Sequence, residues 1–566
     1  MLILFIGTGV YLTVKSGFFQ IRCANIIGRK TVLSLFRKRP ERHGEKSVSP
    51  FQALTTALAS TLGNGNIVGV ATAISCGGAG SVFWMWVSAF FGMMTHFSES
   101  VLGIYFRHKN ERGEWMGGPM YYLEEGLKNK KIGRFLAMSF ALFCMLASFG
   151  IGNMTQVNSI SAAMKESFGL SRLFCGISLA VLAGFVILGG VQRIGRVTEK
   201  IVPLMSFLYI VAALWIVICN ISRIPYVFTS IFQSAFSLQA VGGAGTGLVM
   251  KRAVGMGVRR GVFSNEAGLG SSVMAHCAAD VREPAEQGMW GVFEVFVDTI
   301  VVCTLTAFVI LSTTVEAEPL EQGLADLGTD VRYVTLSGES GTVDLIHTAA
   351  HPEYAIGSEG GRAYPVTTVD GKEYVVYLRE PKDADYVFTN VMKLRGIQSK
   401  DEQGRLLFTD DGRPIITAVS FESLDGISLA TYAFARRFGP FAGKMLSVAV
   451  LFFAFATVLG WSLYGAQAAE YLLGPAAGQP FKLLFILAII IGATQGMEQV
   501  WSISDTLNGL MAIPNLIGVL YLSPLAISIL KNYEDRYIAN KDVLPLRSAY
   551  EQIPNSGFKA RTPFIK

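Results

Sequence analysis

Long apolar segments recur along most of the chain, separated by short polar connections. A helix needs about 20 apolar residues to cross the hydrocarbon core of a bilayer, which is about 30 Å thick. Windows of that length predict eleven transmembrane helices. They lie at residues 1–15, 50–76, 82–106, 133–162, 172–191, 201–221, 226–250, 286–313, 441–465, 481–498 and 503–530.

The first of these helices is shorter than the others. Its apolar part runs from Met1 to Thr13, which is too short to span the bilayer. It has no basic stretch before it and no A-x-A cleavage site, so it does not resemble a cleaved signal peptide. We therefore expect an incomplete transmembrane helix whose native beginning lies upstream of Met1.

One long region does not fit the membrane. Residues 315–430 are polar, and they alternate as strands do in VRYVTLSG and GKEYVVYLRE. Asp-Gly pairs at 370–371 and 411–412 predict hairpin turns. The pattern predicts a small β-rich insert between two helices. Two roles remain open for it: a solubilising or protein-interaction module, or a direct part in gating or substrate capture.

Composition agrees with a membrane protein. Of the 566 residues, 51% are hydrophobic and only 16% are charged, whereas soluble domains contain about 25% charged residues. The 60 glycines suit tightly packed membrane helices, because small residues let backbones approach closely. We expect an all-α polytopic membrane protein with the β-rich insert as its only other part.

Basic connections give the orientation. Positive charge gathers in the loops at 36–46, 107–115, 192–200 and 251–260, which fall on one side if the helices alternate. That side is predicted to be cytoplasmic. The N-terminus and the insert, in which twenty acidic residues outnumber ten basic ones, are then extracytoplasmic.

The predicted organisation therefore has four parts in a cell membrane (the inner or plasma membrane). Residues 1–314 form the first membrane part with eight helices, and 315–430 form the insert. Residues 431–530 form the second membrane part with three helices, and 531–566 form a cytoplasmic tail.

Cysteines and histidines give no sign of metal or disulfide chemistry. The seven cysteines are scattered, mostly within apolar segments, and form no C-x-x-C pair. The six histidines show no spacing of the H-E-x-x-H type. Without a nucleophile–base pairing or a metal cluster at membrane depth, the chain is not expected to be an enzyme.

Two glycine-rich interruptions stand inside apolar segments. The first is LGNGNIVGV, with Gly63, Asn64, Gly65 and Asn66, and the second is QAVGGAGTG, which includes residues 242–247. Glycine costs a helix about 1 kcal/mol relative to alanine, and asparagine needs partners in hydrocarbon. Two interrupted segments in corresponding positions of two halves indicate the binding site of a secondary transporter. The alternative is that these glycines only permit tight helix packing.

A broken helix has a simple chemistry. It leaves unpaired N–H groups on one half and unpaired C=O groups on the other. The N–H end attracts a carboxylate, and the carbonyl end coordinates a small cation. The two interruptions together could hold a zwitterion and its coupling ion at mid-membrane.

Other polar residues at membrane depth could complete such a site. Gln156 lies in GNMTQVNSI, and Asp298 lies in FVDT before a long uncharged stretch; Asp298 either binds substrate or locks helices together. Thr457 and Trp461 lie one turn apart and are either an ion ligand and a pocket wall or ordinary packing residues. Asp505, near a predicted membrane edge, could be only a helix cap.

Seven motifs resemble the alanine or glycine:cation symporter family, and the match as a whole runs from about Gly17, in GFFQIR, to about Ser523. They are TTALASTLGNGNIVGVATAI, SVFWMWVSAFFGM, GGPMYYLEEGL, GNMTQVNSI, RRGVFSNEAGLGSS, FAFATVLGWSLYGAQAAEYLLG and DTLNGLMAIPNLIGVLYLS. The resemblance implies a LeuT-like fold of two inverted five-helix repeats, preceded by one extra N-terminal helix. It also implies sodium-coupled uptake of alanine, glycine or a similar small neutral amino acid.

The resemblance further implies the binding residues. Those expected around the substrate are Gly63, Asn64, Gly65, Asn66, Gln156, Gly242, Gly243, Asp298 and Trp461. Those expected to bind sodium are Ala59, Leu62, Ala454 and Thr457.

Three features depart from the family. Asn64 stands where the family usually has threonine, which changes a side chain beside the expected pocket. Ala456 precedes Thr457 where the family often has two threonines, so one hydroxyl is missing. The acidic insert replaces what is ordinarily a short loop.

These observations predict a sodium symporter, with proton coupling as the less favoured choice of ion, that works by alternating access. The alternative is a sensor derived from a transporter that signals through the insert. A sensor would bind the amino acid without accumulating it.

Overall fold

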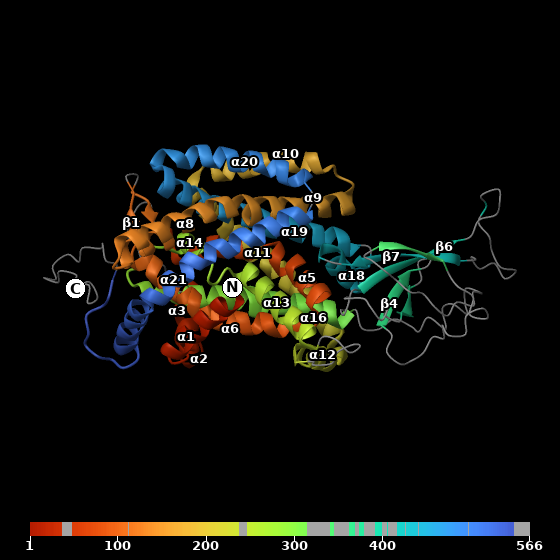
Figure 1. The fold of residues 1–566 in the computed structure, drawn as a ribbon, viewed down its shortest axis with the longest axis horizontal. Helices are drawn as coiled ribbons and strands as arrows, with labels where there is room; N and C mark the ends of the chain where they lie inside the picture. Colours follow the sequence, from red (N-terminus) through yellow and green to blue (C-terminus); the bar gives the residue numbers. More distant parts are fainter. Residues whose placement is uncertain are drawn as a thin grey trace.

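The structure of the chain is a computed structural model. It describes residues 1–36, 48–110, 113–236, 246–313, 340–344, 362–367, 373–378, 391–398, 405, 416–424, 426–439, 441–495 and 497–547. These residues are mostly helical, and the helices form one elongated bundle with the strands of the insert at one end (Figure 1).

The first half of the membrane region runs from the N-terminus to residue 236. Its α-helices are α1 (Leu2–Lys15), α2 (Phe19–Arg22), α3 (Ala24–Lys30), α4 (Pro50–Thr61), α5 (Val68–Gly77), α6 (Gly80–Tyr105), α7 (Pro119–Gly126), α8 (Lys130–Phe149), α9 (Thr155–Phe168), α10 (Arg172–Ile187), α11 (Gly190–Cys219) and α12 (Ile224–Phe236). Its short 3-10 and π-helical turns are η1 (Val32–Phe36), η2 (Asn64–Asn66), η3 (Gly150–Met154) and η4 (Ile221–Arg223).

The second half carries the remaining helices. They are α13 (Thr246–Asn265), α14 (Val273–His276), α15 (Pro284–Val295), the π-helical η5 (Phe296–Cys303), α16 (Thr304–Thr313), α18 (Gly426–Phe438), α19 (Phe441–Leu473), η6 (Pro475–Ala477), α20 (Gly478–Thr494) and α21 (Met497–Tyr537). Helix pairs such as α10 and α20 lie side by side at the top of Figure 1 although they are far apart in the sequence.

The starts and ends of several helices follow from local chemistry. Ser49 and Gln52 form a capping box ahead of α4, and Pro50 occupies its first turn, where the missing N–H has no helical partner. Helix α9 ends at Gly169, which adopts the left-handed conformation that glycine tolerates.

Five strands of the insert form one sheet. They are β3 (Ser340–Asp344), β4 (Arg362–Thr367), β5 (Glu373–Leu378), β6 (Val391–Gln398) and β7 (Ile416–Leu424), in the order β3-β7-β6-β4-β5. All pairs are antiparallel except β4 with β6. The two Asp-Gly pairs lie outside the described residues, as does the whole predicted strand VRYVTLSG. A separate small hairpin joins β1 (His108–Lys109) to β2 (Trp115–Met116).

The outer surface of the helical bundle is apolar, and many polar side chains lie inside it. Large hydrophobic side chains are exposed on α10, α11 and α20, for example Phe185, Phe207 and Leu484. A soluble protein would not expose a belt of this kind. Six described helical segments are long and apolar enough to cross a membrane, and α4 with η2 and α5 forms a further span that is bent. The chain is a multi-pass membrane protein.

The sequence-based prediction is wrong for residues 226–260. It placed a transmembrane helix at 226–250 and a loop at 251–260. In the structure α12 ends at Phe236 and 251–260 lie within α13. The four basic residues of KRAVGMGVRR lowered the apolar signal, yet α13 packs closely on α6. A Cβ on Gly257 would lie 2.3 Å from the carbonyl oxygen of Ser81 on α6. Close packing of glycine, rather than hydropathy, therefore holds this helix in the bundle.

Candidate functional site

The first predicted interruption is present. Helix α4 ends at Thr61, α5 begins at Val68, and the two halves are bent by 59° at the break. The side-chain oxygen of Asn66 accepts the N–H of Gly63 at 3.0 Å, which closes the turn between the halves.

The break releases carbonyl groups at the end of α4. In a continuous helix the N–H groups of Gly63 and Asn64 would bond to the carbonyls of Ala59 and Ser60. Here Gly63 N–H donates to Thr61 O at 2.9 Å, and Asn64 N–H donates to Gln156 Oε1 at 3.3 Å. The carbonyls at this end are therefore available to a cation.

Gly63 also brings three distant segments together. A Cβ on this residue would lie 2.5 Å from Thr457 Oγ1 on α19 and 3.2 Å from Gln156 Oε1 on α9. Only glycine fits without displacing one of them. Three residues that the sequence analysis proposed from separate motifs therefore meet at one point.

The side chain of Asn64 is buried against α9, and its part in substrate binding stays a prediction. Its side-chain nitrogen donates to Thr155 O at 3.2 Å and to Ser159 Oγ at 2.9 Å. These hydrogen bonds connect the break to α9. The departure from the family's threonine therefore adds hydrogen bonds between the break and a neighbouring helix.

Asn66 and Asp298 form a second set of contacts. Asn66 Nδ2 donates to Asp298 Oδ1 at 2.7 Å, while Ser264 Oγ and Thr299 Oγ1 both donate to Asp298 Oδ2 at 2.8 Å. The carboxylate thus links η2, the end of α13 and η5, and all of these groups are buried. This geometry matches the helix-locking alternative. Substrate binding by Asp298 stays a prediction.

Trp461 lies one turn after Thr457 on α19, and its role as a pocket wall stays a prediction. Its indole N–H donates to Glu266 Oε1 at 2.8 Å. Its ring covers Gly152 in η3, where a Cβ would lie 2.2 Å from Trp461 Cβ. Phe263 lies against Gly65 within the break, where a Cβ would lie 3.2 Å from Phe263 Cδ1. One aromatic ring therefore contacts the break directly.

Three of the residues expected to bind sodium lie on α4 and α19, which touch, and the fourth, Leu62, directly follows α4. Ala59, Leu62, Ala454 and Thr457 are all buried. The contact is close, since a Cβ on Gly460 of α19 would lie 3.2 Å from Thr56 O of α4. Carbonyl and hydroxyl oxygens are the ligand types that this cation takes at a broken helix. Their coordination of sodium stays a prediction.

The second predicted interruption cannot be compared with the structure. Gly242 and Gly243 lie outside the described residues. A different interruption appears after α13, where the helix stops at Asn265 and helical structure resumes only at Val273. Glu266, Gly268 and Gly270 there have φ values of 55°, 92° and 76°.

This interruption was not predicted from the sequence. Ser264 contacts Asp298, and Glu266 accepts hydrogen bonds from the Trp461 indole and the Ser271 hydroxyl. The segment SNEAGLGSS, which joins a glutamate to two closely spaced glycines, is the sequence signal that corresponds to it. The interruption is hidden in the sequence because the basic residues of 251–260 are typical of a loop.

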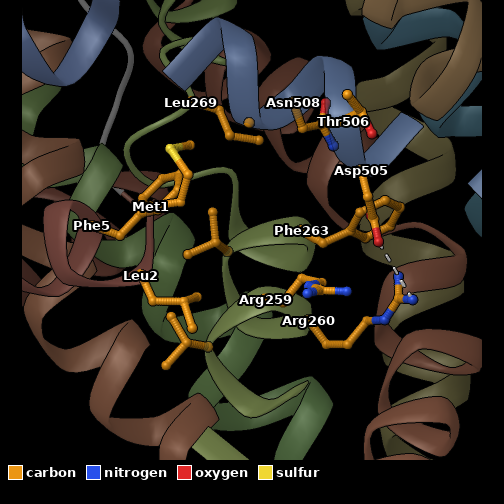
Figure 2. A pocket seen from close by; sticks show the side chains of 13 residues that line it. Met1, Leu2, Phe5, Arg259, Arg260, Phe263, Leu269, Asp505, Thr506 and Asn508 are labelled. Atoms are coloured by element: carbon orange, nitrogen blue, oxygen red, sulfur yellow. Dashed lines mark ion pairs between the residues drawn. The ribbon is translucent and has the colours of Figure 1, made fainter. Parts of the chain in front are cut away.

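A cavity of about 520 Å³ lies beside α13 and α21 (Figure 2). Arg260 and Asp505 lie together at one side of it, with their nearest charged atoms 3.8 Å apart. Asp505 lies eight residues inside α21, which begins at Met497, so its interpretation as a helix cap is wrong. Its partner is an arginine that the sequence analysis assigned to a loop.

The fold and the broken span define a polytopic α-helical membrane transporter. The model of the family described as "Sodium:alanine symporter family" matches residues 1–340 and 413–545. The chain belongs to this family. The matched residues leave out 341–412, which is most of the insert.

Characterised and uncharacterised relatives agree with this assignment. The chain is 38% identical over 535 residues to "Sodium/alanine symporter AgcS" of Methanococcus maripaludis. That alignment covers 94% of this chain and 94% of the relative. It is 34% identical to "Uncharacterized transporter YflA" of Bacillus subtilis, covering 92% of this chain and 88% of the relative. It is 30% identical to "Probable sodium/glutamine symporter GlnT" of the same organism, covering 96% and 89%. None of these names supports the sensor alternative.

Among solved structures, a manganese transporter of Eremococcus coleocola is similar at 12% identity. The alignment covers 88% of this chain and 82% of that chain, with a TM-score of 0.45. The family assignment rests on the sequence relatives.

Proposed function

We propose that this chain is a sodium-coupled symporter that carries a small neutral amino acid, alanine or glycine, into the cell by alternating access. The observation that carries the proposal is the 59° break between α4 and α5, with Gly63, Gln156 and Thr457 meeting at it. Proton coupling is the alternative for the ion.

Each end of the break offers groups that suit one of the two solutes, the sodium ion or the amino acid. The carbonyls freed at Ala59 and Ser60, together with the hydroxyl of Thr457, suit a sodium ion. The N–H groups at the start of η2 and α5 suit the carboxylate of an amino acid. Binding of either ligand then favours the other, because both stabilise the same bent backbone.

Close packing at the break favours a small side chain. A Cβ on Gly63 would lie 2.5 Å from Thr457 Oγ1, and a Cβ on Gly65 would lie 3.2 Å from Phe263 Cδ1. Alanine and glycine have the smallest side chains, so they add the least volume to such a site. A larger amino acid would require neighbouring side chains to move.

The order of the helices supports the 5+5 arrangement. Counting α4–α5 as one broken span, the next spans are α6, α8–α9, α10 and α11. A second set begins with the interrupted α13 and continues with α15–α16, α19, α20 and α21. Helix α1 precedes both sets. Each set thus begins with an interrupted helix, as expected of two structural repeats.

The proposed topology follows from the same count. It places the N-terminus and the insert outside the cell, and the C-terminal tail inside it. The β1–β2 hairpin, with Arg107 and Lys109, then lies on the cytoplasmic side, in agreement with the preference of basic residues for that side.

The test is uptake by purified protein in proteoliposomes. With an inward sodium gradient, labelled alanine should accumulate inside, and collapse of the gradient with a sodium ionophore should stop it. Unlabelled glycine should compete, while a large amino acid such as tryptophan should not. Accumulation that is indifferent to sodium but follows a pH gradient would assign proton coupling instead.

A further inference from the structure

A cluster of four buried ionisable side chains lies next to the second interruption, outside the proposed binding site. His96 and Glu99 come from α6, His276 from α14 and Glu294 from α15, and each is 0% exposed. Buried charges are costly in a bilayer, so their arrangement needs a physical explanation.

His96 has a carboxylate at each ring nitrogen. Its Nδ1 lies 3.2 Å from Glu99 Oε2, and its Nε2 lies 3.2 Å from Glu294 Oε2. Where both carboxyl groups are ionised, both ring nitrogens must donate, yet a neutral imidazole carries only one N–H. Where the ring is neutral, one carboxyl group must be protonated and donate to it. The Ser272 hydroxyl could also donate to a neutral Nε2 at 3.3 Å, but the lone pair of that nitrogen would then lie 3.2 Å from Glu294 Oε2. The pair of contacts therefore favours one additional proton.

His276 provides an internal comparison. Its Nε2 lies 2.6 Å from Glu294 Oε2, but its Nδ1 lies 2.6 Å from the amide nitrogen of Gln287, which donates. One ring nitrogen donates and the other accepts, so the neutral form satisfies this ring. The additional proton therefore lies in the contacts of His96 with its two carboxyl groups, and the imidazole is the stronger base among them.

A metal ion explains the cluster less well. His96, His276 and Glu294 have ligand atoms close enough together to suggest one. Two ligands of a tetrahedral zinc ion, each about 2.0–2.1 Å from the metal, lie about 3.3 Å apart. The 2.6 Å separation of His276 Nε2 and Glu294 Oε2 is too short for that and is a direct hydrogen bond.

Other ionisable groups approach the cluster from neighbouring elements. They are Glu266 after α13, Tyr122 on α7, Tyr464 on α19, Cys277 after α14 and Asp298 in η5. A base, Arg107, lies beside Cys277 and donates to its carbonyl oxygen at 3.1 Å. The groups that contact His96 itself include two carboxyl groups, which favour a cation at the centre.

The cluster holds the second interruption in place. Glu99 accepts the N–H of Gly268 at 3.3 Å and a hydrogen bond from Asn515 on α21. Asn515 also donates to Gly268 O at 2.9 Å. The Ser272 hydroxyl lies 3.3 Å from His96 Nε2. Loss of the proton would leave a lone pair of the His96 ring facing a carboxylate. The resulting repulsion would weaken these hydrogen bonds.

We propose that His96, Glu99 and Glu294 form an intramembrane proton-binding site, in which one resident proton on His96 fixes the shape of residues 266–272. On binding, the proton adds to the free ring nitrogen of neutral His96, and no other bond forms or breaks. The site is separate from the proposed sodium and amino-acid site.

The test is nitrogen-15 NMR of the full chain in lipid, with ¹⁵N-labelled histidine, at pH 9. Free histidine is almost entirely neutral at that pH. The wild type should nevertheless show one imidazolium with both ring nitrogens protonated. Glu99→Gln should abolish that signal, because its amide can donate to His96 Nδ1 and remove the need for the proton. The matched control Glu166→Gln, on the exposed face of α9, should keep the signal.

Several results would overturn the proposal. They are a wild type with only neutral histidines at pH 9, an imidazolium that persists in Glu99→Gln, or stoichiometric zinc whose removal by a chelator changes the histidine spectrum. Loss of the imidazolium signal in His96→Gln would assign that signal to His96. If His96→Gln fails to fold, the comparison of Glu99→Gln with the wild type still tests the proposal. Since the NMR measurement does not require transport, failure of sodium-driven uptake would contradict the proposed function without affecting the proton site.

Discussion

Gly63 shows how one residue decides the shape of the proposed site. Its missing side chain lets the end of α4, the amide of Gln156 and the hydroxyl of Thr457 meet. The glycine and asparagine content of residues 63–66 predicted this break from the sequence alone, because both residue types weaken a helix in hydrocarbon. The partners of the break could not be predicted in the same way, since they lie about 90 and 390 residues further along the chain.

We expect Gly63→Ala to lower sodium-driven alanine uptake without preventing membrane insertion. The added carbon would lie 2.5 Å from Thr457 Oγ1, and overpacking of this kind costs about 1–3 kcal/mol, or about 5- to 150-fold in affinity. Uptake and surface expression are measured together. The control is Gly255→Ala in α13, where nothing lies within 4 Å of the added carbon. Full uptake by Gly63→Ala would contradict the proposed site.

Variants of Thr457 distinguish between its two possible roles, an ion ligand and a packing residue. Removal of its hydroxyl by Thr457→Ala should raise the sodium concentration for half-maximal uptake about tenfold or more, because an interaction between a hydroxyl and a charge contributes about 1.5–3 kcal/mol. Thr457→Ser keeps the oxygen and should stay close to the wild type. If both variants show the wild-type sodium dependence, Thr457 is not a ligand.

Asp298 is expected to act mainly through its hydrogen bonds. All three donors around it, from Asn66, Ser264 and Thr299, point at the carboxylate. Asp298→Asn would turn an amide N–H toward at least one of them, at a cost of about 1–3 kcal/mol. We expect a lower unfolding temperature in detergent together with reduced uptake. A raised KM for alanine with unchanged thermal stability would instead make Asp298 a substrate ligand.

At the scale of elements, the two interruptions were not equally predictable. The α4–α5 break lies in a strongly apolar segment, so the polar residues within it stood out. Helix α13 carries Lys251, Arg252, Arg259 and Arg260, and a hydropathy window cannot separate such a helix from a basic loop. Its position depends on packing against α6, which is a property of the folded molecule. The break after it was consequently missed, although Gly268 and Gly270 were visible.

The second interruption should be intolerant of side chains at its glycines. Gly270 has a φ of 76°, and a Cβ there would lie 2.5 Å from Pro119 Cγ. Gly190 has a φ of 73° but no atom within 4 Å of such a Cβ. Both alanine variants bear the left-handed strain of about 1–2 kcal/mol. Gly270→Ala should in addition lose thermal stability and uptake because of overpacking, and equal behaviour of the two variants would contradict the described packing.

At the scale of the whole molecule, the pattern of apolar segments was sufficient for the class of protein. It could not give the arrangement of the helices around the break, since that depends on contacts such as those of Trp461 with Gly152 and Glu266. The buried cluster of His96, Glu99, His276 and Glu294 escaped the sequence analysis for the same reason. Its members come from three helices and show no recognisable spacing.

The insert should be dispensable for transport. It lies between α16 and α18 at one end of the bundle (Figure 1), and most of it falls outside the residues that match the family. Replacement of residues 316–424 by a short Gly-Ser linker should leave sodium-driven uptake intact, because loops between elements tolerate large changes in length. Loss of uptake by a correctly inserted deletion variant would favour a direct role in gating or substrate capture.

The central claim is that one broken span binds the amino acid and sodium together. The most direct measurement is equilibrium binding of labelled alanine to the purified protein, with and without sodium, for the wild type and Gly63→Ala. Sodium should tighten alanine binding in the wild type, and alanine should tighten sodium binding by the same factor, because coupling between two sites is reciprocal. The coupling should be lost in Gly63→Ala. Alanine binding that is equally tight without sodium in the wild type would contradict the account.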